Sequence, residues 1–400
     1  MIKWFKNIGP GVLVAAAFIG PGTVTVCTLA GVNFGYTLLW AMTLSIIATV
    51  ILQEMAARVG IITQKGLADI IKEQIKYPIL KKLAVILILS AIVIGNAAYE
   101  AGNISGASLG ISAVFGESLY YLYPLVIGII AFIVLYIGNY KILERSLVAL
   151  VLIMSTSFVL TAIITKPDFA LMFKGMFIPN FPKGSMLTII GLIGTTVVPY
   201  NLFLHASLVK EKWKEKSDLK FARKDTYISI ILGGFVSMAI IIAATAINGS
   251  EIKNGIDLAK GLEPLYGNYA KYFLGIGLFA AGITSAITAP LAAAYVANSC
   301  FGWNANLKSL KFRIVWFLIL ILGVIFSSLK INPIEIIKFA QIANGILLPV
   351  IALFLVWIVN KTSVLGTYKN GLLQNIISGV IILITIILGF KSILKVFELL

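Results

Sequence analysis

Apolar runs recur along the chain from about residue 10 to residue 390, separated by short segments rich in Lys, Arg, Gly and Pro. Each run has the roughly 20 mostly apolar residues that a helix needs to cross a bilayer. Because backbone polar groups inside lipid must be paired within their own segment, each run is predicted to be a helix. The eleven predicted spans are approximately 10–33, 36–60, 83–114, 122–139, 146–165, 187–209, 227–248, 270–300, 311–329, 335–359 and 374–391. This pattern predicts an all-α membrane protein.

The composition agrees with that class. Hydrophobic residues make up 60% of the 400 positions and charged residues 12%, whereas a soluble domain has roughly 45–50% and 25%. No long polar block interrupts the apolar runs, so one membrane domain is predicted over residues 1–400. The first run follows Met1–Lys6 without an A-x-A-like cleavage site, and we expect it to remain as a span rather than to be removed as a signal peptide.

The formal charge of +16 by itself would be compatible with a nucleic-acid partner, but the placement of the basic residues argues against one. They lie between the apolar runs, where basic residues set membrane orientation. With a cytoplasmic N-terminus, the segments on the cytoplasmic side are the N-terminus, 58–82, 140–145, 210–226, 303–313 and 360–373. These hold 22 of the 32 Lys and Arg residues, seven of them within Lys210–Lys224. A multi-pass plasma-membrane protein with an extracytoplasmic C-terminus is predicted, in contact with lipid and not with nucleic acid.

The sequence contains few residues that could bind a cofactor or form an enzyme active site. Cys27 and Cys300 are not in a CxxC motif, and His205 is the only histidine. A structural zinc site needs about four nitrogen or sulfur ligands, so no resident metal or other cofactor is predicted. An embedded hydrolase would need a nucleophile and base or a metal group, so the chain is not predicted to be an enzyme.

Two spans carry a helix-breaking sequence. Residues 19–23 read Ile-Gly-Pro-Gly-Thr in the first span, and residues 197–201 read Val-Val-Pro-Tyr-Asn in the sixth. A single proline kink is common in membrane helices. Two interruptions at matching places, each opening a set of five spans, are instead typical of inverted-repeat transporters with a substrate site near the midplane. Repeat one is predicted at about 10–165, repeat two at about 187–359 and an extra helix at about 374–391.

Several longer runs match one family. They are Gly9–Ala15, Gly35–Trp40, Leu52–Gly60, Glu144-Arg145 and Asn201–Val209. These runs, spread over nearly the whole chain, resemble the Nramp family of proton-coupled divalent metal transporters. The resemblance implies a LeuT-like fold of two inverted five-helix repeats, followed here by an eleventh transmembrane helix.

The two breaks depart from that family. Where it has Asp-Pro-Gly-Asn, residues 20–23 read Gly-Pro-Gly-Thr, and where it has Met-Pro-His, residues 198–200 read Val-Pro-Tyr. The family's Asp, Asn and Met bind the metal, so a carboxylate, an amide and a thioether are missing here. A dehydrated divalent cation needs oxygen, nitrogen or sulfur ligands, preferably with negative charge. Thr23, Tyr200, Asn201 and backbone carbonyls remain, and we expect them to bind Mn²⁺ or Fe²⁺ poorly.

Without the carboxylate, the breaks resemble an anion site. The second half of each broken helix begins with free N–H groups and a positive dipole end of roughly half an elementary charge. The predicted substrate site consists of Gly20, Gly22, Thr23, Val198, Tyr200 and Asn201. A small inorganic anion is the predicted substrate, with bicarbonate as the specific candidate. A divalent cation such as Mg²⁺ or Mn²⁺ is the main alternative, and a closed, degenerate site is another.

An anion entering a negative-inside cell works against about 2.3 kcal/mol per charge per 100 mV, so its accumulation requires coupling to H⁺ or Na⁺. Glu54 and Glu100 are the acidic residues within spans. The family's proton route has an Asp and, three residues later, a Glu, which correspond to Glu100 and Asn103. His205 matches a family histidine on that route, and histidine titrates near neutral pH. The structural alternatives are an interhelical hydrogen bond for Glu100 and a packed core position for His205.

Gln341 lies in the tenth predicted span and corresponds to a family glutamine near the outer gate. Interhelical hydrogen bonding is the alternative role for this amide. Neither the motifs nor the composition requires an oligomer, and they leave open whether the ion moves through a carrier or a channel.

Overall fold

The computed structural model describes residues 11, 19–138, 141–247, 251–303, 306–329 and 331–396, without the side chains of 141–145, 392, 395 and 396. Most of the first half of the first predicted span therefore lies outside the described residues. The same holds for most of the Gly9–Ala15 run and for the side chains of Glu144 and Arg145.

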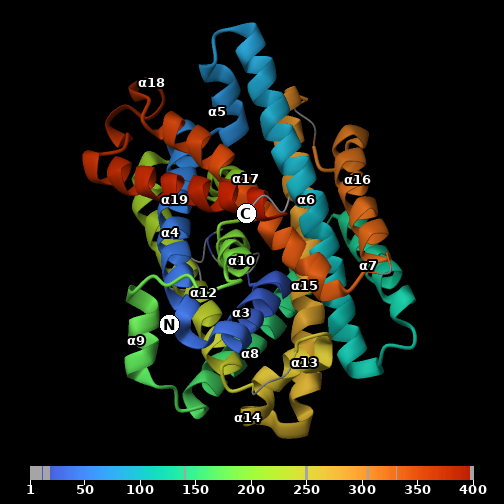
Figure 1. The fold of residues 1–400 in the computed structure, drawn as a ribbon. Helices are drawn as coiled ribbons and strands as arrows, with labels where there is room; N and C mark the ends of the chain where they lie inside the picture. Colours follow the sequence, from blue (N-terminus) through green and yellow to red (C-terminus); the bar gives the residue numbers. More distant parts are fainter. Residues whose placement is uncertain are drawn as a thin grey trace.

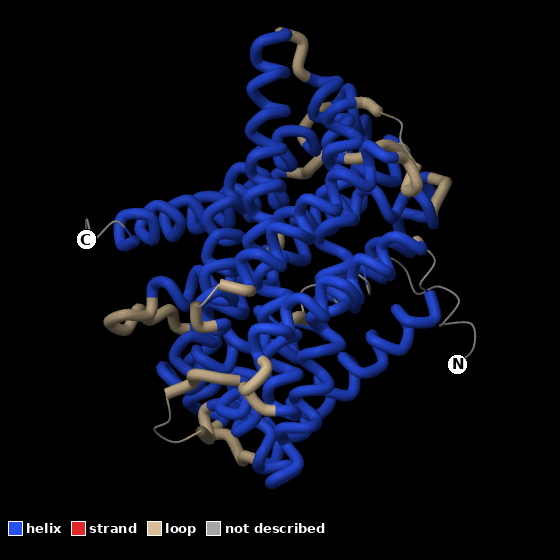
Figure 2. The backbone as a smooth tube through the Cα atoms, turned by 90° about the vertical axis from the view of Figure 1, so that its right-hand side faces the viewer, coloured by secondary structure: helices blue, strands red, loops and turns tan. Residues whose placement is uncertain are grey.

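Every regular element in the described part of the chain is a helix (Figure 2). The long helices are α3 (Pro21–Phe34), α4 (Leu39–Thr63), α6 (Pro78–Phe115), α7 (Tyr123–Ile137), α8 (Lys141–Ile164), α10 (Met186–Thr196), α11 (Pro199–Lys212), α12 (Leu219–Ala244), α15 (Ala270–Phe301), α16 (Leu310–Ser327), α17 (Pro333–Val359) and α19 (Leu372–Val396). The short helices are α5 (Leu67–Gln74), α9 (Phe169–Phe177), α13 (Gly255–Ala259), α14 (Glu263–Tyr266) and α18 (Thr362–Leu365). The 3₁₀ turns are η1 (Gly35–Leu38), η2 (Tyr120–Leu122), η3 (Lys216–Asp218), η4 (Lys260–Leu262), η5 (Gly267–Tyr269) and η6 (Gly366–Tyr368).

Each of the eleven apolar runs corresponds to helix in the described residues. Ten helical stretches are long and apolar enough to cross a membrane, and the first of them joins α3, η1 and α4. The predicted first span is represented by α3 alone, and the predicted sixth span is divided into α10 and α11. The prediction of an all-α membrane protein is confirmed.

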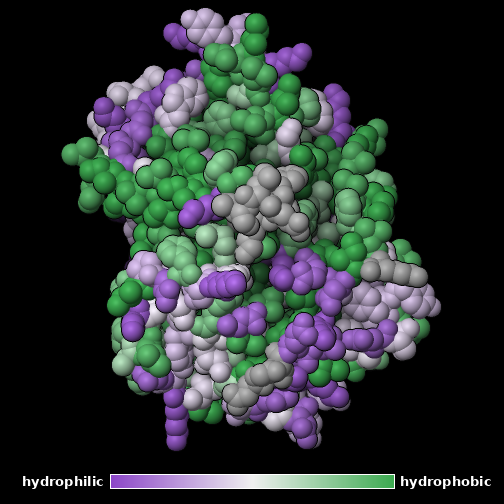
Figure 3. All heavy atoms as spheres, viewed as in Figure 1, coloured by the Kyte–Doolittle hydropathy of each residue, from purple (hydrophilic) through white to green (hydrophobic). Residues whose placement is uncertain are grey.

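Apolar side chains are exposed and polar ones are buried, as expected for a protein surrounded by lipid. Large apolar side chains such as Ile94, Phe235 and Phe390 are 62–63% exposed, whereas Gln53 and Glu100 are fully buried. Exposed apolar surface of this extent marks a membrane-facing protein. In Figure 3, hydrophilic side chains gather toward the two ends of the molecule, and much of the surface on the flanks between them is hydrophobic.

The long helices α6 and α15 pack along each other through small residues (Figure 1). A Cβ atom on Gly110 of α6 would lie 2.7 Å from the Phe279 nitrogen of α15. In the same interface, a Cβ atom on Gly282 would lie 2.6 Å from the Ala107 Cβ atom. Such small residues let backbones approach closely, which favours helix association in membranes.

The helix α19 lies across the direction of α6 (Figure 1). It packs on α17 and α10. Hydrophobic length alone does not set the tilt of a helix, which depends on its packing partners. The eleventh span and the extracytoplasmic C-terminus that follows from it therefore stay predictions.

A buried charged cluster joins α4, α12 and the segment after α18. We call Glu54, Arg58, Arg223, Tyr368 and Asn370 the Glu54 cluster. The Glu54 carboxylate lies 3.0 Å from Arg58 Nη2 and 2.8 Å from Arg223 Nε. Arg58 also donates hydrogen bonds to the Asn370 side chain (2.7 Å) and the Tyr368 carbonyl (2.8 Å). Paired and hydrogen-bonded in this way, the buried charges can be accommodated away from water.

Near the two breaks, α17 contacts α10 and α3 at glycines. A Cβ atom on Gly194 of α10 would overlap the Gln341 carbonyl and lie 2.7 Å from the Gly345 nitrogen of α17. A Cβ atom on Gly22 would overlap the Gln341 carboxamide. These contacts bring α17 directly against the interrupted helices.

Replacing Gly194 by alanine should therefore destabilise the protein. Forcing a methyl group between two backbones costs about 1–3 kcal/mol. We expect the thermal unfolding midpoint of Gly194→Ala in detergent to fall by several degrees relative to the wild type. Gly379→Ala is the matched control, because a Cβ atom there meets nothing within 4 Å and alanine is the better helix former. Equal midpoints for Gly194→Ala and the wild type would contradict the described packing.

Candidate functional site

The first break lies at the start of α3. Gly20 precedes the helix with extended dihedrals (φ −108°, ψ −174°), and Pro21 is its first residue. The first helical hydrogen bond runs from the Val24 N–H to the Gly20 carbonyl at 3.2 Å. The Gly22 N–H group, which precedes this bond, has no acceptor within the helix. The helix α3 thus begins at the predicted helix-breaking sequence, and most of the residues before it lie outside the described residues.

The second break separates α10 from α11. Val197 (φ −91°, ψ 72°) and Val198 (φ −78°, ψ 120°) leave the helical region, and Pro199 begins α11. The Asn201 N–H donates to the Val198 carbonyl at 3.0 Å. A two-residue interruption therefore divides the predicted sixth span at the proline, as the sequence indicates.

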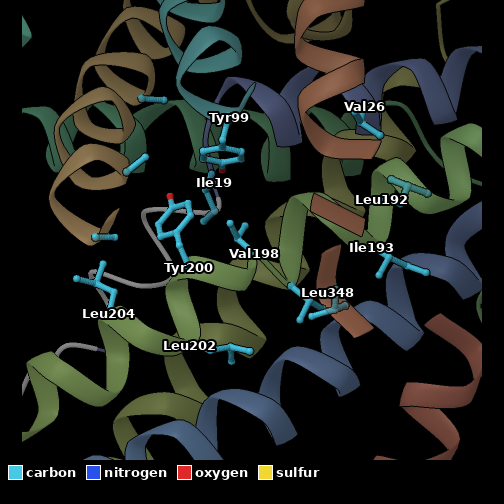
Figure 4. Close-up of a cluster of buried hydrophobic side chains, with 14 of the residues drawn as sticks. Ile19, Val26, Tyr99, Leu192, Ile193, Val198, Tyr200, Leu202, Leu204 and Leu348 are labelled. Carbon is cyan, nitrogen blue, oxygen red and sulfur yellow. The ribbon is translucent and has the colours of Figure 1, made fainter. Parts of the chain in front are cut away.

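The two breaks meet side by side. Figure 4 draws Ile19, Val198 and Tyr200 around one point, with Tyr99 of α6 above them. The Tyr99 and Tyr200 ring centroids are 5.5 Å apart in an edge-to-face arrangement. On the other side of α3, the Thr23 and Thr195 hydroxyls form a hydrogen bond of 2.7 Å. The predicted site residues of both breaks are thus brought together with α6 and α10.

Two amide side chains at the breaks have atoms without a hydrogen-bond partner among the described residues. Asn201 is fully buried, and neither its Oδ1 nor its Nδ2 atom has a hydrogen-bond partner. The Oε1 atom of Gln341 is also buried without a partner. A buried polar group left unpaired costs about 1–3 kcal/mol. These atoms are therefore available to a ligand or to water between the broken helices.

Gln341 lies at the first break itself. Its carboxamide is the group that a Cβ atom on Gly22 would overlap. The side chain predicted for a gate thus adjoins the backbone N–H groups at the start of α3, and its gating role stays a prediction.

The site carries no acidic side chain. Neither α3 nor α10 contains Asp or Glu, and Glu211 lies at the far end of α11. Among the described residues, no three His, Cys, Asp or Glu side chains form a group that could hold a metal ion. The side-chain groups gathered here are neutral, and they include a donor, Asn201 Nδ2, and two acceptors, Asn201 Oδ1 and Gln341 Oε1.

Glu100 and Asn103 lie on α6, next to the breaks. The Asn103 amide donates to Glu100 Oε2 at 3.3 Å, and Glu100 Oε1 has no partner. A Cβ atom on Gly323 of α16 would overlap the Glu100 side chain. Glu100 therefore faces α16, while the neighbouring Tyr99 faces Tyr200.

His205 lies one turn beyond Asn201 and contacts α4. Its Nδ1 atom is 2.9 Å from the Gln53 carboxamide oxygen. Because that oxygen only accepts, Nδ1 carries the hydrogen, and Nε2 is left without a partner. This arrangement fixes the ring as expected for a packed core histidine, and the unpaired Nε2 is still able to accept a proton.

Three contact residues were not predicted from the sequence. Tyr99 reaches Tyr200, Thr195 bonds to Thr23, and Gln53 bonds to His205. All three are polar side chains in apolar runs. Tyr99 and Gln53 directly precede Glu100 and Glu54, and Thr195 lies just before the second break. That adjacency was the available signal.

Comparison with known proteins identifies the family. Residues 11–395 match the family model described as natural resistance-associated macrophage protein-like. A protein of Yersinia pestis named divalent metal cation transporter MntH is 31% identical over 297 residues, which cover 71% of this chain and 70% of that protein. A protein of the same name from Staphylococcus saprophyticus is 27% identical over 99% of this chain and 93% of its own length.

Solved structures agree on the fold. A mutant of the Eremococcus coleocola manganese transporter aligns over 98% of this chain and 87% of its own, with a TM-score of 0.78 at 20% identity. MhsT in complex with L-phenylalanine aligns with a TM-score of 0.64 at 15% identity, over 96% of this chain and 98% of its own. The LeuT-like fold is confirmed. The chain belongs to the Nramp family of multi-pass membrane transporters, and it is a transporter rather than an enzyme.

Proposed function

We propose that this chain is a secondary transporter whose substrate, a small inorganic anion such as bicarbonate, binds between the starts of α3 and α11. One observation carries the choice of an anion. The breaks place the N-termini of α3 and α11 beside the Asn201 amide, with no Asp or Glu in the first turn of either helix. Helix N-termini and their dipoles stabilise negative charge, and a neutral set of donors does not compensate a desolvated dication.

The residue between the broken helices at position 198 supports the same choice. Figure 4 draws Val198 beside Ile19, and Val198 is fully buried, so the position that is Met in the resembled motif is a hydrocarbon in apolar surroundings. A valine side chain offers no lone pair to a metal ion. It does form a dry wall, against which hydrogen bonds from donors to an anion are stronger than in water.

A divalent metal cation is the second candidate, and the comparisons favour it over the anion. The relatives in the curated comparison are named divalent metal cation transporters, and the similar structure is a manganese transporter. None of the comparisons points to an anion. In this chain such a cation would keep much of its hydration shell, because the side chains at the breaks supply only neutral oxygens. Mg²⁺, which dehydrates reluctantly, suits such a site better than Mn²⁺.

The proposal includes coupling to H⁺ or Na⁺, because an anion does not accumulate against a negative-inside potential unaided. Glu100 with its unpaired oxygen and His205 with its unpaired Nε2 are the buried groups that support a proton route. A plasma-membrane location with a cytoplasmic N-terminus is also proposed, supported by the 22 of 32 basic residues on that side.

Transport by purified protein in liposomes decides between the two candidates. We expect saturable uptake of radiolabelled bicarbonate that responds to an imposed H⁺ or Na⁺ gradient, with no uptake of Mn²⁺ or Mg²⁺. Uptake of either cation without bicarbonate uptake would reject the anion and leave the transporter class intact. Flux that does not saturate would indicate a channel.

Gly20→Asp tests the site. The Gly20 φ of −108° is open to any residue, so the backbone accepts aspartate. A carboxylate about 4 Å from a bound anion costs about 4 kcal/mol at an effective dielectric constant of about 20. We therefore expect at least a tenfold loss of bicarbonate affinity, measured as KM for uptake.

Gly371→Asp is the matched control, because Gly371 precedes α19 and a Cβ atom there meets nothing within 4 Å. Its uptake should equal that of the wild type. An unchanged KM in Gly20→Asp would place the anion outside the breaks. A gain of Mn²⁺ uptake in Gly20→Asp with Val198→Met would support the role assigned to these positions.

Asn201→Leu should separate stability from transport. Removing a buried amide without partners should leave the unfolding midpoint equal or higher, while uptake falls at least tenfold. Asn96→Leu is the control, because the Asn96 amide donates to the Ala289 carbonyl at 2.9 Å and its loss should lower the midpoint. A marked destabilisation by Asn201→Leu would mean that the amide serves packing.

A further inference from the structure

A basic pocket lies at the start of α12, away from the broken helices. It has a volume of about 630 Å³. The lining residues that matter here are Lys216, Lys220, Arg223, Lys224, Tyr227 and Tyr368. Four of these six are cationic, so an anionic ligand is the kind that the pocket favours.

The three lysines of the pocket have no ion pair among the described contacts. Lys216, Lys220 and Lys224 are exposed, whereas Arg223 bonds to Glu54 at 2.8 Å. The acidic side chains next in sequence are engaged elsewhere. Asp218 accepts from the Glu215 N–H at 3.2 Å, and Asp225 accepts from the Gly11 N–H at 2.7 Å. These bonds leave the two carboxylate charges in place, but no acidic side chain is among the residues that line the pocket, so its lining is positively charged.

Two of the lining residues, Lys224 and Ile228, begin an exposed apolar stripe along α12. Lys224, Ile228, Ile231 and Phe235 follow one another at intervals of three or four residues, so they share one helix face. Ile231 is 52% exposed and Phe235 63% exposed. An acyl chain can lie along this apolar stripe while a headgroup occupies the pocket. Basic pockets at the ends of transmembrane helices bind anionic lipid headgroups in this way.

We propose that this pocket binds a phosphate-bearing anion, supplied by an anionic phospholipid of the surrounding membrane or by phosphate from solution. Lys216, Lys220 and Lys224 supply the charge, and the Tyr227 and Tyr368 side chains line the pocket beside them. The apolar stripe on α12 favours the phospholipid as the source. The basic run Lys210–Lys224, interpreted above as a solvated loop that sets orientation, thereby gains a binding role.

The pocket also adjoins the Glu54 cluster. Arg223 and Tyr368 belong to both, and the Tyr368 carbonyl accepts from Arg58 at 2.8 Å. A ligand phosphate in the pocket stabilises the arrangement in which α12 and the segment after α18 are held against α4. Bound anion should therefore raise the thermal stability of the whole protein, because a ligand that binds only the folded state stabilises it.

The test uses the full chain in an uncharged detergent. Unfolding midpoints are measured with dioctanoyl phosphatidylglycerol, with zwitterionic dioctanoyl phosphatidylcholine and with inorganic phosphate. We expect phosphatidylglycerol to raise the midpoint by about 2–4 °C or more, and phosphatidylcholine to have little effect. The shift should shrink as salt is added, because exposed charges are screened. A shift with inorganic phosphate as large as that with phosphatidylglycerol would identify solution phosphate as the source.

The variant Lys216→Gln/Lys220→Gln/Lys224→Gln should lose most of the shift and retain fewer phosphatidylglycerol molecules in native mass spectrometry. The control Lys76→Gln/Lys81→Gln/Lys82→Gln removes the same charge from another basic segment and should keep the shift. The single variant Lys220→Gln should bind the lipid more weakly. The lipid concentration that gives half of the maximal stabilisation should rise at least threefold. The proposal is overturned if the wild type responds to neither phosphatidylglycerol nor phosphate. A full shift in the pocket variant, or an equal loss in the control, overturns it as well.

Discussion

An interrupted helix inside a membrane exposes backbone N–H and C=O groups where no water can pair them, and this constraint governs the centre of the molecule. Proline at the first position of α3 and of α11 removes one donor from each start. The glycines at 22, 194 and 345 let α17 approach the breaks closely enough to cover them. The donors that remain, together with the Asn201 and Gln341 amides, are the groups with which a substrate can interact.

The same scaffold can serve ions of opposite charge, because the fold and the ligand set are separate features. The family model matches residues 11–395, and the helix arrangement of the described residues resembles that of a manganese transporter. The ion is selected by the few side chains at the breaks, and here they are glycine, threonine, valine, tyrosine and asparagine. Function follows from such a site and not from the fold that carries it. The names of the relatives and the chemistry of these residues thus give different indications, and transport measurements are the way to choose.

The sequence predicted the long helices, the division between α10 and α11 and the start of α3 because their signals are local. Twenty apolar residues indicate a span, and Pro21 and Pro199 mark where a new helix begins. Long-range partners were not predictable, since Thr23 with Thr195 and His205 with Gln53 are joined only by the folding of distant segments. The direction of α19 was equally inaccessible, because packing on α17 and α10 decides it and hydropathy does not.

The Glu54 cluster has a consequence for any motion of α12 relative to α4. Glu54 and Arg58 belong to the same helix, so they stay paired when α12 moves, and their buried charges remain neutralised. Arg223 is the member contributed by α12, and its side chain is already 39% exposed. Its guanidinium can therefore exchange the carboxylate for water at modest electrostatic cost, since half-hydrated ion pairs contribute little. The two helices are joined here by a contact that can be released and remade without stranding a charge in the core.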